Sequence, residues 1–247
     1  MGKAYRTSIS THKDGKPYVY GYDLTKLAQS PSFTRTIYLI LQGKLPDKNS
    51  ERMLDAILTI SIDHGVAPSS VVAARNVYSG GSPVQAAVAA GILAFGEFHG
   101  GAVEKAMENF EAYVGRVPAE VVGEFSKRGE RLSGFGHRVY SVDPRTQALV
   151  EIAKDLGFFG KYVKFAQKLE TELSGGGKAL PLNIDGIIAA LLLEMDFNPK
   201  VGKGIFIIAR TPGLVAHVVE EATREKPVRR LVDDEIEYDG PKPREGK

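Results

Sequence analysis

The sequence predicts a mainly helical, all-α protein with one short β-hairpin near its N-terminus. Through most of the 247 residues, apolar positions recur every three or four residues, which is the spacing of amphipathic helices. The exception is the start of the chain, where the alternating runs "AYRTSIS" and "PYVYGYDL" flank "KDGK". Asp-Gly between two alternating runs is the strongest short hairpin signal, so we expect a hairpin there.

Helical patterns follow the hairpin to near the C-terminus. The third of them should be capped by Asn49 or Ser50 and stopped by Gly65. Further on, an alanine-rich helix, which we expect to be buried, precedes an amphipathic helix that begins after Gly101. The polar tail from residue 226 has no pattern of a regular element. The predicted helices cover 23–30, 32–46, 49–65, two segments within 82–115, 118–132, 144–158, 161–173, 183–195 and 203–225.

Composition excludes several classes of function. The 32 Lys and Arg residues nearly balance the 30 Asp and Glu residues, so the charge gives no general reason to bind nucleic acid or a membrane surface. Because there is no cysteine, disulfides, thiolate nucleophiles, Cys-type zinc sites and iron–sulfur clusters are excluded. The start lacks the apolar run of a signal peptide, and no stretch reaches the about 18 apolar residues of a membrane span. We therefore expect a cytoplasmic protein.

Four segments place a histidine or an aspartate beside glycine: His64 in "SIDHG", His99 in "GEFHGG", His137 in "SGFGHRVY" and Asp185 in "LNIDG". Glycine lets the backbone approach a ligand closely, and amide groups at a helix N-terminus favour an anionic substrate. A single histidine is more often structural than catalytic. Histidines combined with a carboxylate, however, suit proton transfer.

Three arginines, Arg75, Arg145 and Arg210, could bind the carboxylates of such a substrate through bidentate hydrogen bonds. The ordinary role of an arginine is instead a salt bridge within the protein. Arg145 lies at a helix start, and Arg210 lies inside an apolar helix, where its charge needs a partner. The histidines form no HExxH, HxH or i, i+4 pair, so we expect no metal site.

These segments carry a resemblance to a known family. The stretch "GFGHRVYSVDPR" resembles the most recognisable segment of the citrate synthase superfamily, and "FHGGAVEKAM" and "LNIDG" resemble its other two active-site segments, in the family's order. The likeness extends from "YVYGYDL" to "GIFIIARTPGLVAHVVEE". It implies a helical, citrate-synthase-like enzyme. Its large dimerisation domain would comprise 1–102 and 195–247, and a small domain, 103–194, would close over a CoA substrate.

The resemblance also implies catalytic roles for three residues. His99 would hydrogen-bond the thioester oxygen and stabilise the enol of acetyl-CoA. His137 would bond to the oxaloacetate carbonyl or the citryl hydroxyl. Asp185 would move the proton at the acetyl methyl carbon. A carboxylate can act on so weak a carbon acid only where the enolate receives a preorganised hydrogen bond.

The remaining roles implied by the resemblance concern binding. The residues that would hold the dicarboxylate or citrate are His64, Arg145 and Arg210, and the backbone of Gly134, Phe135 and Gly136 would lie against the CoA. Where the family supplies an arginine from the partner subunit, this chain has Lys226, with Arg229 or Arg230 as substitutes. Lysine lacks the bidentate fork of arginine.

Among the activities of the family, the sequence favours a citryl-CoA lyase, which cleaves citryl-CoA to acetyl-CoA and oxaloacetate. The short N-terminal part and "DHG" are typical of the lyases. The alternative is a short citrate synthase or 2-methylcitrate synthase, which His99 and "GFGHRVYSVDPR" would also fit. A further alternative is a non-catalytic CoA-binding partner subunit, against which the three catalytic residues argue.

In each case we expect no cofactor beyond coenzyme A as part of the substrate. The resemblance implies a homodimer or higher homo-oligomer and leaves open a citryl-CoA synthetase as partner protein. We expect neither a nucleic acid nor a membrane as a partner.

Overall fold

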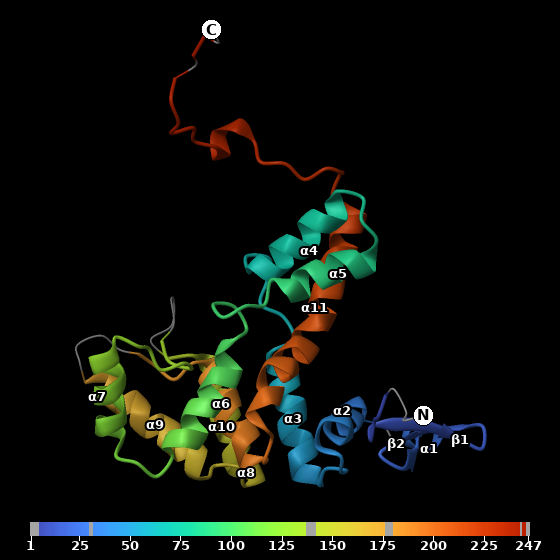
Figure 1. Cartoon of the computed structure of the whole chain (residues 1–247), viewed down its shortest axis with the longest axis vertical. Helices are drawn as coiled ribbons and strands as arrows, with labels where there is room; N and C mark the ends of the chain where they lie inside the picture. The colour runs from blue at the N-terminus through green and yellow to red at the C-terminus, as the bar shows by residue number, and fades with distance from the viewer. Residues whose placement is uncertain (1–4, 30–31, 137–141, 176–179, 243, 246–247) are drawn as a thin grey trace. The chain divides into compact units, whose positions relative to one another are not determined.

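The computed structural model describes residues 5–29, 32–136, 142–175, 180–242 and 244–245 (Figure 1). It confirms the predicted class: the described chain is helical apart from one small antiparallel sheet at the N-terminus. Internal contacts divide it into two compact units. Unit 1 comprises Met1–His64 and Phe95–Pro212, and unit 2 comprises Gly65–Ala94 and Gly213–Lys247. The large and small domains expected from the sequence are a different division, and they stay a prediction.

The sheet has the order β1-β2-β3, with β1 at Ser10–Lys13, β2 at Lys16–Val19 and β3 at Tyr22–Asp23. The predicted hairpin is confirmed, because β1 and β2 are joined through Asp14 and Gly15, whose φ angles of 51° and 74° suit a tight two-residue turn. The first strand begins only at Ser10, at the end of the run "AYRTSIS". The sequence did not predict β3.

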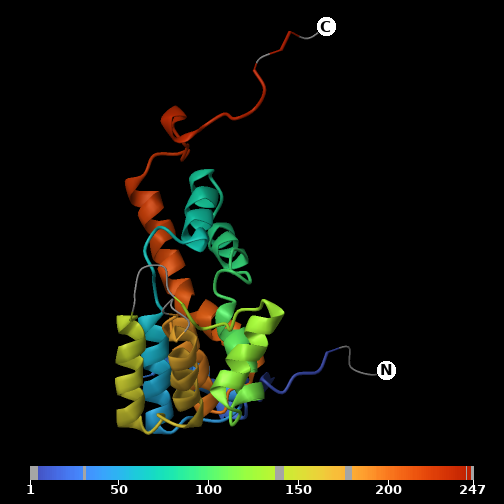
Figure 2. The same cartoon turned by 90° about the vertical axis from the view of Figure 1, so that its left-hand side faces the viewer.

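The core of unit 1 is centred on α10 (Ile184–Glu194), in which every residue from Gly186 to Leu193 is buried. A helix that is apolar all round has to be covered on all sides. It packs against α6, α8 and α9, and α8 also packs against α3, so that α3, α8, α10 and α6 run side by side (Figure 2). The helices of unit 1 besides α10 are α1 (Leu24–Leu27), α2 (Phe33–Gln42), α3 (Lys48–Ile60), α6 (Ala102–Tyr113), α7 (Pro118–Arg128), α8 (Pro144–Leu156), α9 (Lys161–Ser174), the single turn η1 (Pro199–Val201) and the part of α11 (Gly202–Arg224) up to Pro212.

Helix α3 differs from the prediction at both ends. Its N-cap is Asp47, not Asn49 or Ser50. The Asp47 carboxylate accepts a hydrogen bond from the Ser50 backbone N–H at 2.8 Å. The side chain of Asn49 instead donates to the carbonyl of Leu156 in α8. At the other end the helix stops at Ile60, not at Gly65. Residues 61–65 are therefore a loop, which is where His64 lies.

Unit 2 is formed by α4 (Ser69–Ser79), α5 (Val84–Leu93) and the C-terminal part of α11 (Gly202–Arg224), which runs through Pro212. The sequence did not predict α4. The expectation that the alanine-rich helix is buried was wrong for the single chain, because only two residues of α5 are buried. One of them is Gly91, where an added Cβ would lie 3.0 Å from Leu214 and from the Ser70 carbonyl. Four α5 residues are exposed: Val84, Gln85, Ala89 and Leu93.

The sequence predicted no regular element in the tail, and its described part differs only by the single 3-10 turn η2 (Asp233–Glu235). Among the described helices, none combines the length and the apolar character that crossing a bilayer requires.

Candidate active site

Asp185 lies in the first turn of α10, where the cap residue fixes its backbone. The side-chain oxygen of Asn183 accepts hydrogen bonds from the N–H groups of Asp185 at 3.0 Å and Gly186 at 3.1 Å. Burial raises the pKa of the Asp185 carboxyl, and the charges of Arg145 and Arg210 oppose that rise. Some of the Asp185 surface stays accessible, as a group that exchanges protons with a ligand requires.

The glycine segment Gly134–Gly136 is held along the residues that precede α10. The N–H of Gly136 donates to the Pro181 carbonyl at 2.7 Å, and the N–H of Asn183 donates to the Gly134 carbonyl at 3.0 Å. Gly134 has a φ of 92°, and a Cβ there would lie 2.6 Å from the Cα of Gly186. Glycine is therefore required for this segment to lie so close to the start of α10.

Arg145 begins α8 and is oriented by Asp143, the N-cap of the same helix. One oxygen of Asp143 accepts from the Arg145 backbone N–H at 3.0 Å and from its Nε at 3.1 Å, and the other accepts from Nη2 at 2.8 Å. Asp143 is only 1% exposed. This carboxylate occupies the side edge of the guanidinium, whereas Nη1 lies 3.4 Å from Nδ1 of His64. The end of the guanidinium is thus directed to the loop that carries His64.

Arg210 lies inside α11 and is 4% exposed. Its Nε donates to the main-chain carbonyl of Ser61 at 2.8 Å, and its guanidinium carbon lies 4.9 Å from the centre of the Phe206 ring. Burial lowers the pKa of Arg210, and the charges of Asp63 and Asp185 raise it. The sequence predicted that this charge needs a partner: the Ser61 carbonyl accepts one of its N–H groups, and the negative charges of Asp63 and Asp185 act on it.

His99 lies between α5 and α6, with its ring 5.1 Å from the ring of Phe95. Burial lowers the pKa of His99, and the positive charges of Arg210 and His64 lower it further. The imidazole is therefore neutral at pH 7 and can donate one hydrogen bond without carrying a charge. A neutral donor suits a developing enolate, because the imidazole can stabilise the negative charge on the enolate oxygen through a hydrogen bond while keeping its own proton.

The structure brings together five of the residues that the sequence singled out. The charges of Arg145 and Arg210 act on Asp185, and those of Arg210 and His64 act on His99. His137 lies outside the described residues, immediately after Gly136. The role of Asp143 was not predicted from the sequence, although an acidic residue before Pro at a helix start is a recognisable N-cap signal.

Lys226 and Arg229, the other predicted substrate-binding residues, belong to unit 2. Arg229 donates to Glu221 through Nε at 3.1 Å and Nη2 at 2.6 Å, and the Nε of Arg75 donates to the same carboxylate at 2.6 Å. For Arg75 this is the intramolecular salt bridge that the sequence left open. Lys226 lines a pocket of about 250 Å³ that also includes Tyr78. A substrate contact for Lys226 or Arg229 stays a prediction.

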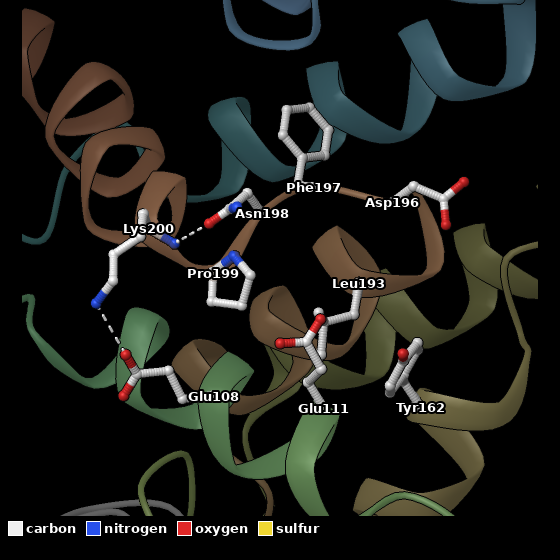
Figure 3. A pocket seen from close by; sticks show the side chains of 9 residues that line it. All are labelled: Glu108, Glu111, Tyr162, Leu193, Asp196, Phe197, Asn198, Pro199 and Lys200. Carbon is white, nitrogen blue, oxygen red and sulfur yellow. Dashed lines mark hydrogen bonds and ion pairs between the residues drawn. The ribbon is translucent and has the colours of Figure 1, made fainter.

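A larger pocket of about 550 Å³ lies at the C-terminal end of α10 (Figure 3). Leu193, two turns along the helix from Asp185, lines it, and Lys200 in its wall donates to Glu108 at 3.1 Å. None of the predicted site residues contributes to it. Within the described chain, no group of three or more His, Asp or Glu side chains could hold a metal ion. The lining residues are Glu108, Glu111, Tyr162, Leu193, Asp196, Phe197, Asn198, Pro199 and Lys200.

Comparison with known proteins gives concordant matches. The family model "Citrate synthase, C-terminal domain" matches residues 46–231. The structure of citryl-CoA lyase from Hydrogenobacter thermophilus is 46% identical, with a TM-score of 0.93, and the match covers 98% of this chain and 97% of that one. Citrate synthase from Thermoplasma acidophilum, solved with carboxymethyl coenzyme A and oxaloacetate, is 27% identical with a TM-score of 0.72, covering 87% of this chain and 59% of that one.

A curated relative is longer than this chain. ATP-citrate synthase beta chain protein 1 of Arabidopsis thaliana is 28% identical over 257 residues, which include 94% of this chain. The chain spans 41% of the length of that relative.

Proposed function

This chain belongs to the citrate synthase family, and we propose that it is a citryl-CoA lyase, which cleaves citryl-CoA to acetyl-CoA and oxaloacetate. One observation carries the proposal. The match to the Hydrogenobacter thermophilus citryl-CoA lyase has 46% identity and covers nearly all of both chains. The match to the Thermoplasma acidophilum synthase has 27% identity and covers 59% of that chain.

In the proposed reaction, the bond between the hydroxyl-bearing carbon of the citryl group and the acetyl methylene carbon breaks. His137 accepts the hydroxyl proton as the oxaloacetate carbonyl forms, and the bonding electron pair passes to the acetyl thioester as an enolate. His99 donates a hydrogen bond to the enolate oxygen. A donor of this kind contributes about 3 kcal/mol to the stability of the transition state.

Asp185 then delivers a proton to the acetyl carbon. A carboxyl group with an ordinary pKa is almost fully ionised at neutral pH and is a poor proton donor. The raised pKa of Asp185 supports its role, because it keeps a larger share of the group protonated at the working pH.

Arg145, Arg210 and His64 hold the carboxylates of the substrate. The Asp143 carboxylate occupies the Nε edge of Arg145, which leaves N–H groups at the opposite end of the fork for a second carboxylate. Arg210 adds a second, buried positive charge that acts on Asp185. The backbone at Gly134–Gly136 lies against the CoA.

The second candidate is a citrate synthase, because the likeness to the Thermoplasma acidophilum enzyme extends over 87% of this chain. The same residues would make the carbon–carbon bond rather than break it, with Asp185 removing the proton from acetyl-CoA. A synthase must in addition hydrolyse the citryl thioester. Free CoA is therefore the product that separates the two functions.

The test supplies the purified protein with citryl-CoA and, separately, with oxaloacetate plus acetyl-CoA. Oxaloacetate is followed through the NADH consumed by malate dehydrogenase, and free CoA through its thiol. We expect oxaloacetate from citryl-CoA without free thiol. Free thiol from the second mixture would support a synthase instead, and no product in either mixture would contradict both candidates and leave a CoA-binding subunit.

We further propose that the protein is a homodimer located in the cytoplasm. Exposed apolar side chains of unit 2 support the homodimer, since Leu93 in α5 is 84% exposed and Val219 in α11 is 50% exposed. A C2 dimer that paired these helices with the same helices of a second copy would cover them. Light scattering of the purified protein measures the mass directly. A citryl-CoA synthetase is a proposed partner, because the substrate has to be formed from citrate and CoA by another enzyme.

A further inference from the structure

Asn183 is bonded on both sides, to the helix that carries Asp185 and to the glycine segment. Its Oδ1 accepts from the N–H groups of Asp185 and Gly186 at 3.0 and 3.1 Å. Its Nδ2 donates to the carbonyl of Gly136 at 3.0 Å. Its backbone N–H donates to the carbonyl of Gly134 at 3.0 Å. One residue therefore links the first turn of α10 to both ends of Gly134–Gly136.

The side-chain amide is suited to this link in a way that the other capping residues are not. An N-cap needs only an acceptor, which serine, threonine or aspartate provides as well as asparagine. The Gly136 carbonyl, however, needs a donor at a second position. Asparagine has an acceptor oxygen and a donor nitrogen on one planar group, whereas an ionised aspartate has no donor.

The surroundings of Asn183 are fixed. The preceding residue, Leu182, is 2% exposed, and its N–H donates to the carboxylate of Glu170 in α9 at 2.8 Å. On the glycine side, the ring of Phe135 packs edge-on to Phe110 in α6, with centroids 6.0 Å apart. The side chain of Asn183 therefore joins two segments that are each packed against the core of unit 1, beside the backbone bonds between them.

We propose that Asn183 is a positioning residue, which sets the distance between the Asp185 carboxylate and an acyl-CoA held against Gly134–Gly136. This inference rests on the proposed function, in which Asp185 delivers a proton to the acetyl carbon of that CoA. Proton transfer requires the acid and the carbon to be held close together, and a misplacement of 1 Å costs on the order of 10²-fold in rate. The CoA itself would be held by many contacts. The loss should therefore fall on kcat more than on KM.

The test is Asn183→Ser, which keeps an N-cap oxygen and removes the donor to Gly136. The matched control is Asn198→Ser at the other end of α10, where Asn198 caps η1 by accepting the Lys200 N–H at 2.9 Å (Figure 3). We expect both variants to have melting temperatures close to that of the wild type. For citryl-CoA cleavage, we expect kcat of Asn183→Ser to fall about 10- to 100-fold with KM nearly unchanged. The control should keep the wild-type values.

A role limited to helix capping predicts something different. In that case Asn183→Ser would resemble Asn198→Ser in kcat, and the proposal would be overturned. Asn183→Asp is the second variant. It retains the cap oxygen but places a negatively charged carboxylate oxygen next to the Gly136 carbonyl, which repels it. We expect it to lose at least as much kcat as the serine variant. Wild-type kcat in Asn183→Asp would also overturn the proposal.

Amide hydrogen exchange tests the link independently of the chemistry. The N–H groups of Gly136 and Asn183 are both bonded across the two segments. We expect both to exchange faster in Asn183→Ser, while the N–H of Ile187 in the second turn of α10 changes little. If the wild type does not cleave citryl-CoA, the proposed function is wrong. Amide exchange then still tests whether Asn183 links the two segments. Unchanged exchange at Gly136 would overturn the link.

Discussion

Two arginines of the candidate site, in unit 1, use their guanidinium groups differently from two arginines of unit 2. In unit 2, Arg75 and Arg229 both bind Glu221, a carboxylate that is 2% exposed on its side chain. In unit 1, Asp143 takes one edge of Arg145, whose Nη1 reaches toward His64, and Arg210 donates to a main-chain carbonyl. Removing one arginine from a pair that surrounds a buried acid leaves that charge less compensated, which destabilises the fold. An arginine that a single acid holds by one edge is oriented and keeps donors for a ligand.

The largest expected effect is at Asp185, the acid on which the charges of Arg145 and Arg210 act. Asp185→Asn removes the proton donor while keeping the shape of the side chain. We expect cleavage of citryl-CoA to fall by about 10²- to 10⁴-fold, the range that general acid–base catalysis contributes. Binding of CoA, measured by calorimetry, should persist. Cleavage at the wild-type rate would remove Asp185 from the mechanism.

The next effect separates the two groups of arginines by function. Arg145→Lys keeps the charge but loses the fork, so that a bidentate contact with a carboxylate cannot form. We expect kcat/KM for citryl-CoA to fall about 10- to 100-fold, the equivalent of the 1.5 to 3 kcal/mol of a charge-assisted hydrogen bond. Circular dichroism and the melting temperature should stay near those of the wild type. If lysine serves equally well, Arg145 does not bind a carboxylate through its fork.

Arg75→Ala should have the opposite profile. It leaves the buried carboxylate of Glu221 with Arg229 as its remaining partner in this ion-pair cluster. We expect the free energy of unfolding to fall by about 1 to 3 kcal/mol, because a buried acid loses a hydrogen-bonded cation. The measurement is a urea denaturation curve. An unchanged free energy of unfolding together with a fall in kcat/KM would contradict the difference between these arginines of the two units.

Local sequence patterns predicted most of the fold. The Asp14-Gly15 hairpin, the amphipathic helix after Gly101 and the start of α8 at Pro144 all depend on residues adjacent in the chain. The error at α3 was of the same local kind, since Asp47 competed with Asn49 and Ser50 for the cap and could not be distinguished from them by residue type.

The candidate site was predictable in its residues but not in its partners. Glycine-flanked histidines and Asp185 are visible in the sequence. The bond from Asn183 to Gly136 joins positions 47 residues apart, and the bond from Arg210 to Ser61 joins positions 149 apart. The apolar run around Arg210 predicted that its charge needs a partner, but no local pattern predicted Ser61 as the group that reaches it. The same holds for Glu221 at Arg75, because the folded chain decides which group meets each guanidinium.

The smallest expected effect concerns the acid that orients Arg145. Asparagine caps helices as well as aspartate does, so Asp143→Asn keeps the N-cap and the oxygen that faces Nε of Arg145. The substitution removes only the negative charge. The negative charge of Asp143 contributes to the raised pKa of Asp185. Without it, the pKa of Asp185 falls, because a nearby negative charge favours the protonated form of a carboxyl group.

The sign of the shift follows from the step that Asp185 performs. Cleavage requires its proton, so activity is lost as the pH rises through its pKa, and in Asp143→Asn that loss should begin at a lower pH. The measurement is a pH profile of kcat for citryl-CoA cleavage. Asp47→Asn, which changes the same residue type at the cap of α3, is the control and should keep the wild-type profile. A shift to higher pH would contradict the assignment of this limb to Asp185. An unchanged profile would mean that Asp143 acts on Arg145 alone.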